Sequence, residues 1–194
     1  MSFFNWPVQF SQCSPHIMGR RKRLAEGLLD LFSSTFPDIN YEMFWDVPIL
    51  NAQAWRLGAK RYVRLYGGLI RHPSVTKAGL ALTIAHETGH HLGGPPYDPD
   101  LPWITWQGQA DYWAARTAMP LLFGEKACNL TLRGAREIIK LHSAMVSVFE
   151  EDAPDLLPEC RYSIFEAGAR GRNMPTCGQA AFAEILGDSC NFKW

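Results

Sequence analysis

Residues Val75–Leu92, VTKAGLALTIAHETGHHL, are the stretch of sequence that decides the fold. The stretch is strongly apolar, and two glycines and two prolines follow it directly. An apolar segment of this length that ends at glycine and proline predicts a buried helix. His86, Glu87 and His90 form an H-E-x-x-H pattern on the last turns of this predicted helix.

The H-E-x-x-H pattern matches the chemistry of a zinc site. Residues four apart lie on one face of a helix, so His86 and His90 can reach one ion while Glu87 flanks it. Zinc binds neutral imidazole nitrogens and lowers the pKa of a bound water to about 7. Glu87 is the predicted catalytic residue, a general base that takes a proton from this water and passes it to the leaving amine. Two hydrogen-bonded core histidines beside a solvent-facing Glu87 are the alternative interpretation.

Length and charge narrow the class of protein. The chain has 194 residues, with 19 Lys and Arg against 19 Asp and Glu. This length suits a single domain over residues 1–194, in which 1–15 form an irregular arm. A net charge of zero gives no field that gathers nucleic acid or an anionic membrane. No apolar stretch approaches the ~20 residues of a membrane span, so we expect a soluble protein, and the compartment stays open, including export after removal of a signal.

The remaining sequence predicts an α+β fold, with a small sheet followed by a mostly helical C-terminal half. Aromatic and branched residues bounded by turn residues indicate the strands, and apolar residues at helical spacing indicate the helices. The predicted strands are Tyr41–Val47 and Arg61–Tyr66, and the further predicted helices are Ile17–Phe32, Trp103–Phe123, Leu132–Glu151 and Gln179–Leu186.

Two motifs and two shorter matches resemble a known family. The first motif is HETGHHLGGPP at 86–96, and the second is QGQADYWA at 107–114. Together they resemble gluzincin-type zinc metallopeptidases, most specifically a bacterial family with the motifs HExGHHLGGxP and EGQADY[FW]A. GGLIRHP at 67–73 and Cys160-Arg161 also look like that family.

The resemblance implies a zincin-like domain with an edge strand beside the H-E-x-x-H helix. By this analogy the strand that lines the substrate cleft is Arg61–Tyr66, and the helix with the third metal ligand begins near Trp103. The analogy also places Cys160 and Cys177 close together, which implies a disulfide if the protein is exported.

One residue departs from the family pattern. Gln107 stands where the gluzincin pattern has the ligating glutamate, and a neutral amide oxygen is a weaker ligand than a carboxylate. Asp111 lies one turn further along the same helix face, so we predict Asp111 as the third metal ligand with His86 and His90. In the alternative, Gln107 completes the site and Asp111 orients a histidine ligand.

The sequence therefore predicts a zinc-dependent peptidase with a peptide or protein substrate. Two alternatives remain: a degenerate zincin that binds or regulates without hydrolysis, as Gln107 suggests, and a metalloenzyme that acts on a small molecule. Helical spacing of the tryptophans and the amphipathic character of the segment favour roles in packing and solubility for Tyr112, Arg116, Trp103, Trp106 and Trp113.

Overall fold

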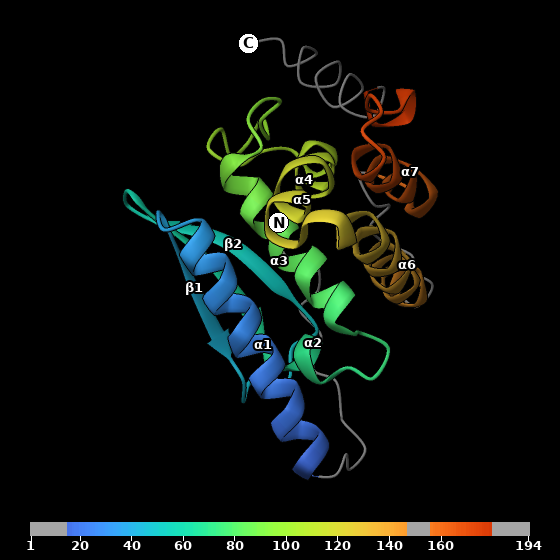
Figure 1. The fold of residues 1–194 in the computed structure, drawn as a ribbon. Helices are drawn as coiled ribbons and strands as arrows, with labels where there is room; N and C mark the ends of the chain where they lie inside the picture. Colours follow the sequence, from blue (N-terminus) through green and yellow to red (C-terminus); the bar gives the residue numbers. More distant parts are fainter. Residues whose placement is uncertain (1–14, 147–155, 180–194) are drawn as a thin grey trace.

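The computed structural model describes residues 15–146 and 156–179 (Figure 1). Over these residues the chain is an α+β structure, as the sequence predicts. In chain order the elements are α1 (Pro15–Thr35), β1 (Ile39–Phe44), β2 (Ala52–Leu57), β3 (Lys60–Tyr66), α2 (Gly67–Arg71), α3 (Lys77–Leu92), α4 (Gln107–Trp113), the π-helical turn η1 (Ala114–Ala118), α5 (Met119–Phe123), the 3-10 turn η2 (Gly124–Lys126), α6 (Ala127–Val146) and α7 (Pro158–Ala169).

The described strands form one mixed sheet in the order β1-β3-β2. β1 runs parallel to β3, and β2 runs antiparallel to β3 through a hairpin whose turn includes Gly58 at φ 58°. The expectation that Arg61–Tyr66 is the edge strand is therefore wrong, because β3 is central. β2, which the sequence analysis did not predict, lies at the edge and packs against α3.

Helix α3 runs through the middle of the molecule, with the sheet on one side and α4 and α6 on the other (Figure 1). Every residue from Ala78 to His91 is buried. A helix that is enclosed on all sides must be apolar around its whole circumference, which explains the composition of this stretch. The side chain of Thr76 caps the N-terminus of α3 by accepting from the backbone N–H of Ala78.

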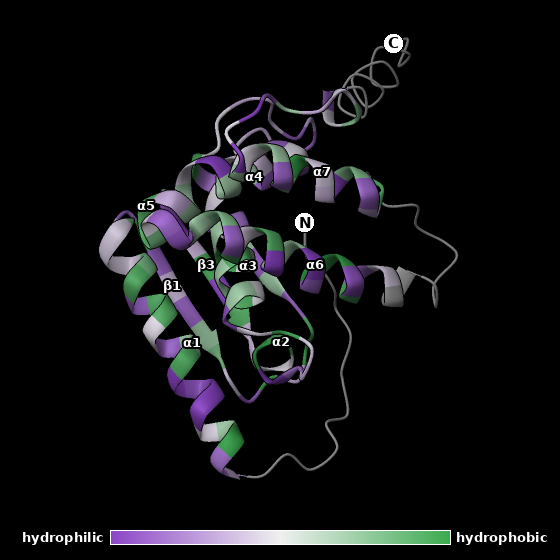
Figure 2. Ribbon diagram, turned by 45° about the vertical axis from the view of Figure 1, so that its right-hand side comes forward, coloured by the Kyte–Doolittle hydropathy of each residue, from purple (hydrophilic) through white to green (hydrophobic). Residues whose placement is uncertain are grey.

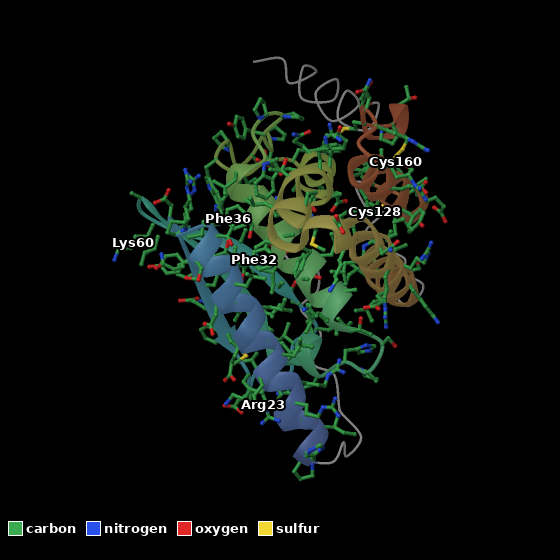
Figure 3. The ribbon with its side chains drawn as sticks, viewed as in Figure 1. Arg23, Phe32, Phe36, Lys60, Cys128 and Cys160 are labelled. Atoms are coloured by element: carbon green, nitrogen blue, oxygen red, sulfur yellow. A yellow bond between two sulfur atoms is a disulfide. The ribbon has the colours of Figure 1, made fainter. Side chains whose placement is uncertain are left out.

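Helix α1 covers the same face of the sheet as α3. Phe32 of α1 contacts Tyr41 of β1 with ring centroids 5.9 Å apart, and the Tyr41 hydroxyl lies 3.0 Å from the Thr88 hydroxyl of α3. Hydrophobic and hydrophilic bands alternate along α1 (Figure 2), and Phe32 lies near its C-terminal end beside Phe36 (Figure 3). The amphipathic α1 thus closes the core over the sheet.

Helix boundaries differ from the predicted ones mainly in the C-terminal half. The helix expected from Trp103 begins at Gln107, and a π-helical turn interrupts it at Ala114–Ala118. Helix α6 begins at Ala127, before the expected Leu132, and α7 was not predicted. The helix expected at Gln179–Leu186 lies outside the described residues beyond Gln179. None of the helices in the described ranges is long and apolar enough to cross a membrane.

Candidate metal centre

Three buried side chains of α3 form a cluster suited to a metal ion. His86, Glu87 and His90 each place one potential ligand atom within 4.8 Å of the others. Their exposed fractions are 1%, 0% and 0%, and the two imidazole rings meet edge to face with centroids 4.5 Å apart. The spacing of the H-E-x-x-H pattern on a regular helix explains this convergence.

His86 is oriented by a buried carboxylate from the neighbouring helix. Its Nδ1 lies 2.6 Å from Asp111 Oδ1 on α4, and Asp111 is fully buried. A nitrogen that faces a carboxylate in this way donates its proton, so Nε2 is the nitrogen left to bind a metal. This arrangement is the usual one around histidine ligands of zinc.

Asp111 is in turn paired with Arg161, which comes from α7. The guanidinium donates from Nε to Oδ2 and from Nη2 to Oδ1, each at 2.7 Å. Burial alone would raise the pKa of Asp111, but the charge of Arg161 and the contact with His86 hold that pKa below its usual value. The bidentate pair therefore keeps Asp111 ionised and fixes its position.

His90 is oriented by the backbone. Its Nδ1 lies 2.7 Å from the carbonyl oxygen of Thr105, in the loop before α4, and so donates to it. Its Nε2 is buried and has no hydrogen-bond partner among the described residues. A buried polar atom without a partner is costly, so this nitrogen fits a metal ligand better than a structural core histidine.

Close packing of α3 and α4 brings these groups together. Gly89, inside the H-E-x-x-H pattern, faces Ala110 of α4, and a Cβ atom at position 89 would lie 2.8 Å from the Ala110 carbonyl oxygen. Only glycine allows this approach without movement of a backbone. Asp111, the next residue on α4, can therefore reach His86.

Burial dominates the electrostatics of the cluster. Burial lowers the pKa of both His86 and His90. For His86, the contact with Asp111 opposes this shift. Burial raises the pKa of Glu87 to about 8, and the backbone of Ala54 on β2 offsets part of that rise. Neutral imidazoles are the form that binds zinc, and a nearby cation would favour the Glu87 carboxylate.

The structure brings together three of the predicted site residues and places the fourth differently. Asp111 lies against His86 Nδ1 and Arg161 rather than within the His86, Glu87 and His90 cluster. Both of its oxygens are engaged, so it corresponds to the alternative in which this aspartate orients a histidine. Direct ligation by Asp111, as expected from its charge, would require the loss of these contacts.

Several neighbours of the site have other partners. The Tyr112 hydroxyl donates to the carbonyl of Arg172 at 2.7 Å, which agrees with a structural role. Trp106 is buried and Trp113 packs on the main core, as expected, whereas Trp103 lies on the ring of His91, with centroids 5.7 Å apart. Cys160 and Cys177 form a disulfide, and Cys160 lies on α7 (Figure 3).

Sequence reasoning did not assign a role to Arg161 or to Thr105. Arg161 had one signal in the sequence, because it belongs to the Cys160-Arg161 pair that resembles the metallopeptidase family. Thr105 acts through its backbone carbonyl, and a backbone group leaves no signature in the residue type.

Comparisons of the chain with protein-family models, with curated proteins and with solved structures found no match.

Proposed function

We propose that this chain is a zinc-dependent metallohydrolase with a zincin-like fold, and that it hydrolyses peptide bonds. The observation that supports this most strongly is the buried cluster of His86, Glu87 and His90, in which both histidines already donate from Nδ1. The remaining Nε2 atoms are the ones that a zinc ion would bind. Zinc would supply Lewis acidity there, lowering the pKa of water and polarising the substrate carbonyl.

Glu87 acts as the general base in this proposal. It lies in the same buried cluster as the two histidines, and burial raises its pKa to about 8. A zinc ion bound beside Glu87 would lower this pKa, and the ionised carboxylate could then accept a proton from the attacking water and pass it to the leaving amine nitrogen. Glu87 is thus ionised again at the end of the reaction, as it was at the start.

The position of β2 supports a peptide substrate. β2 is an edge strand, and the backbone of Ala54 lies beside Glu87. An extended peptide can add to an exposed sheet edge through backbone hydrogen bonds, which would carry its carbonyl groups past the cluster. A small-molecule substrate would not need such an edge.

The third protein ligand is proposed to come from position 107 or to be replaced by solvent. Asp111 is engaged with His86 and Arg161, whereas Gln107 begins α4 one turn before Asp111 on the same face. A site with two imidazoles and a neutral amide should bind zinc more weakly than one with a carboxylate.

The lack of a further carboxylate ligand favours a second candidate function. This candidate is a degenerate zincin that binds a partner without hydrolysis. Within the described residues the cluster contains no carboxylate besides Glu87. If Glu87 itself is taken up as a ligand, no base remains to activate water.

Metal analysis and a peptide library test the proposal together. We expect about one zinc per chain after purification without added metal, and a melting temperature that falls on chelation. Wild-type protein should cleave members of a broad peptide library, whereas Glu87→Gln should bind zinc without cleavage. Zinc binding without any cleavage by the wild type would support the degenerate zincin, and absence of metal binding would contradict the peptidase.

A further inference from the structure

Two arginines lie directly opposite each other at the end of the β2–β3 hairpin. Arg56 of β2 pairs with Arg61 of β3 in the antiparallel register, so both side chains lie on the same face of the sheet. Like charges that face each other across two strands destabilise a sheet. The stability of the hairpin therefore does not explain why two arginines stand at these positions.

Neither arginine has a carboxylate partner among the described residues. The ion pairs in this part of the chain involve Arg64, Arg133, Arg161 and Arg170 together with His86, and none includes Arg56 or Arg61. Arg56 Nε is also buried without a hydrogen-bond partner in the described ranges. Burial lowers the pKa of Arg56, and the charge of Arg61 lowers it further. A partly exposed guanidinium group that has no carboxylate partner among the described residues is suited to an anion that arrives with a ligand.

The surroundings of Arg56 hold it in place without neutralising it. Its guanidinium carbon lies 4.9 Å from the centre of the Trp103 ring, which itself stacks on His91. The Tyr97 side chain, 46% exposed, also lies near Arg56. Trp103 and Tyr97 belong to the loop between α3 and α4, so the cation lies between this loop and the sheet edge.

The arginine pair is close to the proposed catalytic centre. Arg56 is two residues from Ala54, whose backbone lies beside Glu87, and two residues of a strand span about 7 Å. His91, whose ring contacts Trp103, is adjacent in sequence to His90. A peptide lying along β2 with its scissile bond at Glu87 therefore passes the two arginines within one or two residues.

We propose that Arg56 and Arg61 bind a carboxylate of the substrate next to the scissile bond. This inference rests on the proposed peptidase function and deepens it, because it names the substrate class. The carboxylate belongs either to an aspartate or glutamate side chain or to the C-terminus of the peptide. Both sources offer two oxygens in the geometry that a guanidinium group recognises.

Matched peptides separate these two sources. In the first set of pairs, the two peptides differ only by Glu or Gln at one position beside the cleaved bond, and each such position is tested in turn. In the second set, the two peptides differ only by a free or an amidated C-terminus. For the zinc-loaded full chain we expect kcat/KM about 10–100-fold higher for the carboxylate member of one pair, since a bond to a charged group is worth that much. The pair that shows the preference identifies the source.

Variants of the two arginines assign the preference to these residues. Arg56→Gln and, separately, Arg61→Gln should lower kcat/KM for the carboxylate peptide towards that for the neutral peptide and so remove most of the preference, while Arg56→Lys should restore part of it. Lys60→Gln is the matched control, because Lys60 is the neighbouring exposed cation and points away from the body of the molecule (Figure 3). Loss of repulsion should leave the melting temperature of Arg56→Gln equal to or above that of the wild type.

A binding measurement keeps this inference separate from the proposed function. Fluorescence anisotropy of the same labelled peptides with zinc-loaded Glu87→Gln requires no turnover. One outcome supports the inference and contradicts the peptidase proposal. In that outcome the wild type cleaves no peptide, the carboxylate peptides bind more tightly than the neutral ones, and Arg56→Gln removes this difference in affinity. Cleavage or binding without a carboxylate preference, a preference that survives in both arginine variants, or no peptide binding at all overturns the inference.

Discussion

The two histidines of α3 occupy equivalent places in the motif but are oriented by different parts of the molecule. His86 donates to the Asp111 side chain, which Arg161 of α7 holds in place. His90 donates to a backbone carbonyl, that of Thr105 in the loop before α4. A side-chain partner can be removed by substitution, whereas a backbone partner survives almost any residue at its position. The His86 side of the site should therefore be sensitive to mutation well away from α3, and the His90 side should not.

Glu87→Gln should have the largest effect, because it removes the base common to both sides of the site. We expect hydrolysis to fall by about 10²–10⁴-fold, the usual contribution of a general base. Zinc content and melting temperature, measured on the same preparation, should be retained. Turnover near the wild-type rate would remove the general-base assignment.

Arg161→Met should be the most destabilising change on the His86 side. Asp111 would be left as a buried carboxylate without its guanidinium partner, which costs about 3–5 kcal/mol. Urea denaturation of the metal-free protein measures the loss. Arg133→Met, at an exposed ion pair with Glu137, is the control and should cost less than about 1 kcal/mol. Equal losses in the two variants would show that Arg161 does not support the site.

Removal of the disulfide tests how strongly α7 is held. Cys160 and Cys177 are separated by 17 residues, and a crosslink over a loop of about this length contributes roughly 3 kcal/mol in the chain-entropy model. The double variant Cys160→Ser with Cys177→Ser should lose a similar free energy of unfolding. Because Cys160 adjoins Arg161, zinc affinity should fall as well. An unchanged zinc affinity would show that α7 keeps Arg161 in place without the disulfide.

Asp111→Asn compared with Thr105→Val isolates the difference between the two histidines. The asparagine keeps the size of the side chain but loses its charge, so zinc affinity should fall about 10–100-fold. Thr105→Val keeps the carbonyl that His90 uses, and zinc affinity should stay close to that of the wild type. Competition with a chelator of known affinity measures both. A loss far beyond 100-fold in Asp111→Asn, roughly the limit for an orienting partner, would indicate direct ligation instead.

The sequence by itself determined the elements whose local pattern is strong. The apolar run of α3 predicts a buried helix, and the four-residue spacing of His86 and His90 places their rings together on it, because helix periodicity is a local property. The α+β class and helix α1 follow from periodicity in the same way. The Cys160–Cys177 pairing, expected only by analogy, is present in the structure.

Only the tertiary structure decided which groups surround the motif. The order β1-β3-β2 places the unpredicted β2 at the edge beside Glu87, and strand order depends on contacts between distant segments. Whether Asp111 ligates or orients depends on Arg161, 50 residues away on a helix that the sequence did not predict. The arginine pair becomes visible only in the strand register, which sets Arg56 opposite Arg61. Burial and long-range pairing, which no local pattern records, thus assign the surroundings of the motif.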